Sequence, residues 1–349
     1  MNDSSHLLFV LVLLLLLGCP TLRATSIFDL LFATGGDDAL PVTLVASVHG
    51  DADHPDMGPP LVFSFADSLG RQQNFHLKVT ERGRFRRHTC DHAPLKLDFK
   101  KQELRAAGLS EYDKYKLVMP CFSGRAAEVL VRKEYLAYRA YRLLSPTGFR
   151  VRLLRLTVID PYFPDRRQTS LAFLIESKHE LADRLMAEVS SMPFGLPAAD
   201  YQPRAEVTHA LFQYLIGNTD WDAGLSRNVK SFVTARGELI PVGYDFDFSS
   251  WVNAPYARPR SDLMQHSLSQ RVYLGYPQAE EVFAEAFVHF TRQRAALENL
   301  VGGADLPRYE KRRLGKLIER FYAALPGLSA GHQFSASLLV PSPAPAAAP

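Results

Sequence analysis

Short runs in which apolar and polar residues alternate dominate the first half of the chain, and this alternation predicts β-strands. Clusters of Gly, Pro and Asp separate the runs from one another. The first five runs, VTLVASV, LVFSFAD, NFHLKVT, LKLDF and KYKLVM, lie between residues 41 and 119. Two more, VRLLRLTVID and TSLAFLIES, lie within residues 151–177. We expect the five runs to form a sheet and the last two to complete the same part of the molecule.

Apolar residues at helical spacing appear between these runs and after them. In residues 126–144, Leu130, Ala137 and Leu144 share one face, and Glu134 falls in the middle of that face. Further helices are predicted at residues 180–190, at 204–216 and, as amphipathic segments, within 280–325. The pattern therefore predicts an α+β protein of two lobes with a cleft between them. The β-rich N-terminal lobe, with one long helix, takes residues 40–177, and the mainly helical C-terminal lobe takes residues 178–328.

The N-terminus has the pattern of an export signal. The apolar run from Leu7 to Leu17 is too short for a comfortable membrane span and has the length of a signal-peptide core. Cleavage before Cys19, which would then carry a lipid, and cleavage after Ala24 are the two alternatives, and no Lys or Arg precedes the run. We expect residues 1–24 to direct export to the periplasm or cell envelope, with membrane attachment if Cys19 is lipidated. The Pro- and Ala-rich tail at 329–349 is expected to be disordered.

Composition narrows the classes of function. Of the 349 residues, 47% are hydrophobic, which is enough for a substantial core, and the net charge is only +3. This balance gives no reason to expect nucleic acid as a partner. Cys90 and Cys121 form an even pair, which we expect to be bridged in an exported protein, whereas two free thiols would fit a cytosolic one.

Several acidic and amide side chains gather between the predicted helix at 204–216 and the end of a predicted hairpin. The helix is expected to end at Gly217, and Asp220 and Asp222 follow in a loop. Asn228 then opens the apolar run VKSFV, which a polar turn connects to the run LIPVGYDFDF. The two runs predict antiparallel strands that bring Asn228 and Asp245 to the same end.

This order of residues suits phosphoryl transfer from a nucleotide. The reaction needs a carboxylate that orients the attacking hydroxyl, and an amide oxygen with another carboxylate to hold Mg²⁺. Asp220 or Asp222 would be the first carboxylate, and Asn228 with Asp245 would bind the metal. Asp247 joins the metal ligands only if the chain turns after Asp245. The alternative is a purely structural role, because Asn and Asp are favoured at loop edges, where they cap and turn the chain.

The predicted N-terminal lobe offers residues for nucleotide phosphates. Lys116 on a strand, with Glu134 on the following helix, matches the lysine–glutamate pair by which kinases hold phosphates. Lys96 on the preceding strand is the alternative lysine. Arg84 lies in the basic cluster RGRFRR, which either clamps phosphate or forms a solvated strand edge. Glu176 ends the last strand near the expected connection between the lobes and completes the set.

The segments GNTD at 217–220, NV at 228–229 and YDFD at 244–247 resemble the catalytic segment of the CotH-type kinase-like family and, more distantly, of other atypical kinases such as HipA-like proteins. The resemblance covers roughly residues 75–255. It implies a protein-kinase-like fold that uses ATP and Mg²⁺. Asp220 would then be the catalytic base, Asn228 and Asp245 the metal ligands, and Lys116 with Glu134 the phosphate-orienting pair. Because Asp220 lies eight residues before Asn228, where the kinase loop has a spacing of about five, Asp222 is the alternative base.

Two classes of function follow from these residues. The first is an exported, Mg²⁺-dependent phosphotransferase that moves a phosphoryl group from ATP to a protein or a small hydroxyl acceptor. The second is a non-catalytic, kinase-like binding module of the bacterial cell envelope. A weaker third reading is hydrolysis by paired carboxylates in an aromatic groove, for which Trp221, Tyr244, Trp251 and Tyr256 are at hand.

Overall fold

The structure is a computed structural model that describes residues 24–36, 38–46, 60–83, 86–192 and 194–329. Residues 1–23 of the predicted signal peptide, which include Cys19, lie outside these residues, as do the predicted tail from residue 330 onward and Arg84. Among the helices that are described, none combines the length and the apolar character that a membrane span requires.

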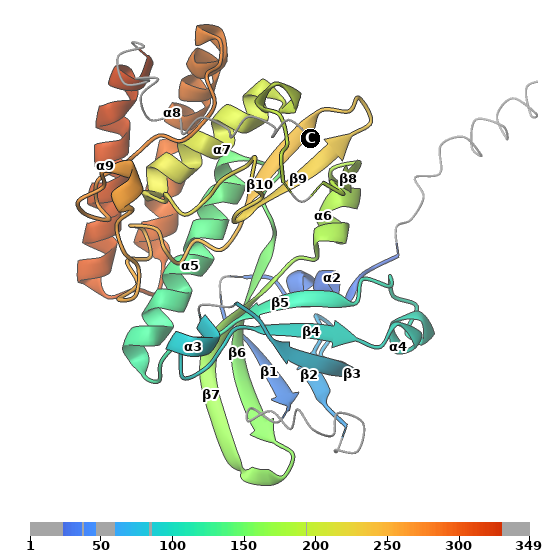
Figure 1. The fold of residues 1–349 in the computed structure, drawn as a ribbon. Helices are drawn as coiled ribbons and strands as arrows, with labels where there is room; N and C mark the ends of the chain where they lie inside the picture. The colour runs from blue at the N-terminus through green and yellow to red at the C-terminus, as the bar shows by residue number, and fades with distance from the viewer. Residues whose placement is uncertain (1–23, 37, 47–59, 84–85, 193, 330–349) are drawn as a thin grey trace, which may run out of the picture.

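Seven strands of the first half form a closed barrel (Figure 1). Its members are β1 (Leu40–Val45), β2 (Val62–Ala66), β3 (Gln72–Glu81), β4 (Leu95–Phe99), β5 (Lys114–Val118), β6 (Val151–Asp160) and β7 (Phe163–Ile175). Neighbouring strands follow the order β1-β2-β3-β4-β5-β7-β6, and every pairing is antiparallel except that of β1 with β6. The parallel β1–β6 pair closes the barrel, because it joins the first strand to the β6–β7 hairpin.

Alternating burial along β1 to β5 reflects one face turned toward the barrel core. Aromatic rings fill that core, and Phe63 and Phe75 both meet Phe99 edge to face. Helix α2 (Ile27–Ala33) adds Phe28 and Leu31 to the same core. The short helices α3 (Arg86–Thr89) and α4 (Lys101–Ala106) lie between strands of the barrel sequence. The sequence pattern did not predict these three helices.

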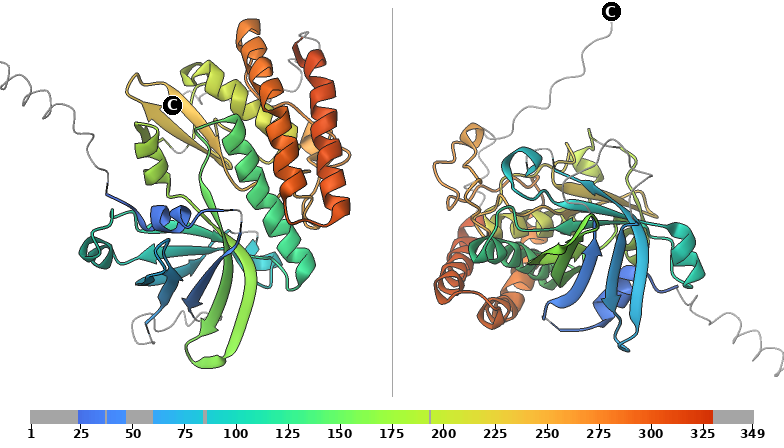
Figure 2. Two further views of the ribbon diagram at one scale, coloured as in Figure 1. Left: turned by 180° about the vertical axis from the view of Figure 1, so that it is seen from behind. Right: turned by 90° about the horizontal axis from the view of Figure 1, so that it is seen from below.

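Helices and a small sheet make up the rest of the molecule (Figure 2). The helices are α5 (Arg125–Leu144), α6 (Lys178–Arg184), α7 (Pro203–Ile216), α8 (Glu280–Gly303) and α9 (Arg308–Ser329), with 3-10 turns η1 (Ala198–Asp200) and η2 (Ser261–Leu263). The sheet has the order β10-β9-β8, from β8 (Ala187–Val189), β9 (Val229–Thr234) and β10 (Leu239–Gly243). The β9–β10 pair is the predicted hairpin. The helix predicted at 180–190 is wrong in its second half, because the chain enters β8 and pairs with β9 there.

The prediction of a two-lobe, protein-kinase-like fold is wrong, although the α+β class is confirmed. The strands of the first half close on themselves as a seven-stranded barrel. At the end of the β6–β7 pair that holds Val151 and Ile175, both strands bury residues on both faces. One face lines the barrel there, and the other packs against α5. One hydrophobic core therefore runs without a break from Leu153 and Phe173 of the barrel through α5 and α7 to α8 and α9.

The predicted disulfide between Cys90 and Cys121 is present, and it joins the end of α3 to the segment that leads into α5. The bridged cysteines are 31 residues apart, so the bridge restricts a long loop in the unfolded chain.

Replacing both cysteines by serine is expected to lower the free energy of unfolding by about 3–4 kcal/mol, because the unfolded chain regains the entropy of that loop. Denaturant unfolding of the two proteins measures the difference. A free-thiol count of two for Cys90 and Cys121 in the purified native protein would contradict the bridge itself.

Candidate functional site

The β9–β10 hairpin brings Asn228 and Asp245 to one end. Val229 pairs with Gly243, and beyond this pair the Tyr244 amide donates to the Asn228 carbonyl oxygen at 3.0 Å. Asn228 and Asp245 both adopt left-handed backbone conformations, with φ of 51° and 63°. Such angles are uncommon outside glycine, and here they turn the chain at both strand ends. The amide of Asp245 is held in this turn by a hydrogen bond to the Tyr138 hydroxyl of α5.

Asp220 lies next to Asn228 because helix α7 ends at the predicted residue. Gly217 caps α7 in the left-handed conformation, with φ of 61°, and the Asn218 side chain accepts from the Asp220 amide. The Asn228 side-chain amide then donates to the Asp220 carboxylate at 2.9 Å and to its carbonyl oxygen at 2.8 Å. Burial, together with the neighbouring charge of Asp245, raises the pKa of Asp220 against the opposing effect of Arg227. A raised pKa makes this carboxylate a better proton acceptor.

Cations from the barrel face these acids. The Lys116 ammonium on β5 lies 3.7 Å from the centre of the Tyr244 ring. Burial lowers the pKa of Lys116 to about 7, and the positive charges of Arg82 and Lys230 lower it further while Asp245 opposes them. Arg82, just after β3, lies 3.5 Å from the Asp245 carboxylate. Its buried Nη1 atom has no hydrogen-bond partner among the described residues. Lys116 and Arg82 therefore place positive charge beside Asp245, and the Arg82 Nη1 atom is a donor without a partner among the described residues.

Asp245 remains ionised in these surroundings. Burial alone would raise its pKa, but Arg86, Arg82 and Lys116 outweigh burial and bring the pKa below its usual value. The side chain is 32% exposed, so a bound group can reach it from solvent. Asp245 is thus a charged ligand at the edge of the cation cluster.

Next to this site, Arg86, Glu134 and Asp247 form a buried ion network, which differs from the predicted Lys116–Glu134 pair. Arg86 of α3 donates to the Asp247 carboxylate at 2.6 Å and 3.0 Å, and to Glu134 at 3.4 Å. The Tyr256 hydroxyl donates to the same oxygen of Asp247. Burial raises the pKa of Glu134 to about 8 and that of Asp247 to about 6, in spite of Arg86.

The predicted pairing of Lys116 with Glu134 is therefore wrong, because in the described part of the chain no ion pair joins them and Arg86 takes the glutamate. Asp247 does follow a turn of the chain, as its metal role required, but Arg86 and Tyr256 already engage its carboxylate. Arg86 therefore holds one oxygen of each carboxylate, and the Glu134 Oε1 atom has no hydrogen-bond partner among the described residues.

Three other predicted residues have partners of their own. Lys96 pairs with Lys116 across β4 and β5, so the two side chains lie on the same face, and the Lys96 ammonium lies 3.9 Å from Asp98. Glu176 is buried between Arg150 and Arg184 and fixes the end of β7, so it is structural. Asp222 accepts from the Leu225 amide and caps its own loop.

The site residues fit a nucleotide with a divalent cation in part. Among the described residues, no three His, Cys, Asp or Glu side chains come together as a ready metal site. Asn228 donates through its Nδ2 atom to Asp220. The Asn228 Oδ1 atom and the Asp245 carboxylate are then the oxygens that would bind the cation. Mg²⁺ commonly takes only one or two carboxylates and completes its shell with water and substrate phosphate. The unpaired Arg82 donor and Lys116 suit that phosphate.

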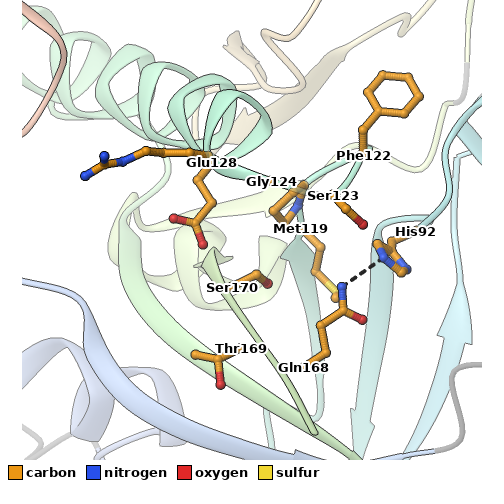
Figure 3. Close-up of a pocket in the computed structure, with 11 residues that line it drawn as sticks. His92, Met119, Phe122, Ser123, Gly124, Glu128, Gln168, Thr169 and Ser170 are labelled. Carbon is orange, nitrogen blue, oxygen red and sulfur yellow. Dashed lines mark hydrogen bonds between the residues drawn. The ribbon is translucent and has the colours of Figure 1, made fainter. Parts of the chain in front are cut away.

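A cavity of about 230 Å³ lies at the start of α5, near the disulfide (Figure 3). Polar side chains line it, among them His92, Gln168 and Glu128. His92 and Gln168 bond to each other, and Glu128 bonds to Arg155 and to the Leu171 amide. None of the predicted site residues lies in this cavity.

Sequence reasoning missed Arg82 and Arg86 as individuals, although it singled out the basic cluster that contains them. The available signal was the proximity of that cluster to Cys90, because a bridged cysteine fixes its neighbours in place. Comparisons extend the description no further: no protein-family model matches the chain, and no curated protein matches it.

Proposed function

We propose that the protein is a Mg²⁺-dependent phosphotransferase that moves a phosphoryl group from ATP to a protein or a small hydroxyl acceptor. One observation carries the proposal: Lys116 and the unpaired donor of Arg82 lie beside Asp245, while Asp220 and Asn228 lie at the same end of the β9–β10 hairpin. The negative charges of a nucleotide phosphate would bind Lys116 and Arg82, and the divalent cation that accompanies it would bind Asp245 and Asn228.

Each residue has a role in this proposal. Lys116 and Arg82 bind phosphate oxygens through charge-assisted hydrogen bonds, which also favour the charged form of Lys116. Asp245 and the Asn228 amide oxygen hold Mg²⁺, which neutralises negative charge on the phosphates. Asp220 orients the acceptor hydroxyl and takes its proton, and the hydrogen bond from Asn228 fixes its carboxylate.

The resemblance of residues 217–247 to the CotH-type catalytic segment supports the same activity. The Cys90–Cys121 disulfide supports an oxidising compartment and hence export to the periplasm or cell envelope. A non-catalytic binding module at the envelope is the second candidate. The absence of the Lys116–Glu134 pair among the described residues favours it, because kinases need that pair in place.

Nucleotide binding is tested by thermal unfolding with and without ATP and Mg²⁺. At about 100 times the Kd, the ligand is expected to stabilise the wild type by about 2.7 kcal/mol. Lys116→Met should lose most of this stabilisation, because it removes the ammonium that faces the phosphates. The variant should still fold, because the ammonium it removes is costly to desolvate.

Lys101→Met is the matched control, because Lys101 lies on α4, is exposed and has its ammonium 3.9 Å from Asp113. It is expected to keep the full shift. Equal shifts for Lys116→Met and the wild type would remove Lys116 from the site.

A further inference from the structure

Three buried polar atoms near the end of α7 have no hydrogen-bond partner in the described part of the chain: His209 Nε2, Gln213 Nε2 and Trp221 Nε1. The side chains are almost fully enclosed, with exposures of 1%, 1% and 4%. Each unsatisfied buried group of this kind costs about 1–3 kcal/mol, so three together call for an explanation.

Two of the three side chains, Gln213 and His209, meet beside Gly243, and Trp221 packs against His209. A Cβ atom at Gly243 would lie 2.6 Å from Gln213 Nε2 and 2.8 Å from His209 Cε1, the carbon bonded to Nε2. The rings of His209 and Trp221 meet edge to face, with centroids 4.8 Å apart.

The direction of hydrogen bonding is fixed from one end. The backbone amide of Asp220 can only donate, so the Asn218 atom that it reaches is the carbonyl oxygen Oδ1. Asn218 therefore donates through Nδ2, and the Gln213 atom that accepts at 2.9 Å is Oε1. Gln213 then presents Nε2, a donor, toward the region beside Gly243. A flip of either amide would break this chain of bonds.

The state of His209 follows from its surroundings. Burial lowers the pKa of His209 to about 3, so the ring is neutral and has one donor and one acceptor nitrogen. Its Nδ1 atom lies 3.0 Å from the Tyr141 hydroxyl, which in turn lies 3.4 Å from the Pro241 carbonyl oxygen. If Nδ1 carries the proton, it donates to Tyr141, Tyr141 donates to Pro241, and Nε2 is an acceptor.

We propose that one buried water molecule links the three atoms, and that His209 is protonated on Nδ1. The water accepts from Gln213 Nε2 and from Trp221 Nε1 and donates to His209 Nε2, which satisfies all three with a single molecule. With the proton on Nε2 there would be three donors for the two lone pairs of the water. Buried waters typically make about three such bonds.

Hydrogen bonds connect the proposed water to the candidate site, whatever reaction that site catalyses. Water, Gln213, Asn218 and the Asp220 amide form one chain of hydrogen bonds. The water ends this chain at His209 and so holds the backbone of Asp220 to the core of α7. The inference is independent of the proposed phosphotransferase, since it concerns only buried groups.

The test uses the wild-type protein and two readouts. A crystal structure at high resolution should show one ordered water within hydrogen-bond distance of all three atoms. Nitrogen NMR should show His209 Nδ1 protonated and Nε2 unprotonated, unchanged from about pH 8 to about pH 5, where an ordinary histidine titrates. Absence of the water, or a proton on Nε2, would overturn the proposal. Loss of phosphotransferase activity in other experiments would not affect it.

Discussion

Replacing Arg86 by methionine is expected to lower the free energy of unfolding by about 3–5 kcal/mol, the usual cost of removing one partner from a buried ion pair. Methionine retains much of the apolar volume but leaves Glu134 and Asp247 buried without a positive charge. Denaturant unfolding at neutral pH measures the loss.

The loss should depend on pH. Burial raises the pKa values of Glu134 and Asp247 to about 8 and about 6, so the folded protein holds their protons more tightly than the unfolded chain. The folded state is therefore penalised as pH rises, from about 3.8 to about 6 through Asp247 and from about 4.5 to about 8 through Glu134. Without Arg86 both pKa values rise further, and we expect the variant to lose less stability near pH 5 than near pH 8.

Arg87→Met is the matched control, because Arg87 is the next residue of α3 and is exposed. A surface change of this kind is expected to stay within about 0.5 kcal/mol of the wild type. A loss of the same size for both variants would mean that α3 itself, and not the buried ion network, is the source of the effect.

The local features of the site follow from the sequence. Apolar runs around a polar turn were enough for the β9–β10 hairpin, and the helix end at Gly217 follows from the conformational freedom of glycine. Asn228 and Asp245 therefore lie at the same end of the hairpin. Glu134 was recognised as a carboxylate on a buried face, and its burial is confirmed, because helical spacing alone fixes which side of α5 it occupies.

The long-range features do not follow from local patterns. Closure of the barrel depends on β1 pairing with β6, and nothing in either run specifies its partner strand. The partner of Glu134 is likewise set by tertiary structure, because the Cys90–Cys121 bridge ties α3 to the approach of α5 and so places Arg86 beside Glu134. The continuous apolar run LAFLI at the end of β7 was a sign of a strand buried on both faces, which an open two-lobe arrangement does not require of it.

Replacing Asp220 by asparagine is expected to reduce phosphoryl transfer by about 10²–10⁴-fold while ATP and Mg²⁺ still bind. The two side chains have the same shape, so the contact with the Asn228 amide can persist through the remaining oxygen. What disappears is the group that takes the proton of the acceptor hydroxyl. Transfer of labelled γ-phosphate from ATP to the protein, to added acceptors or to water measures the rate, and the thermal shift with nucleotide measures binding.

Asp222→Asn decides between the two aspartates of the loop. Asp222 accepts from the Leu225 amide and lies on the side of Tyr276, so the change is expected to leave the rate close to that of the wild type. A loss confined to Asp222→Asn would move the catalytic role to that residue. Nucleotide binding without transfer in the wild type would instead favour the non-catalytic module. Lys116, Arg82 and Asp245 suffice to bind phosphate and metal. A carboxylate beside the acceptor matters only when the acceptor hydroxyl has to lose its proton.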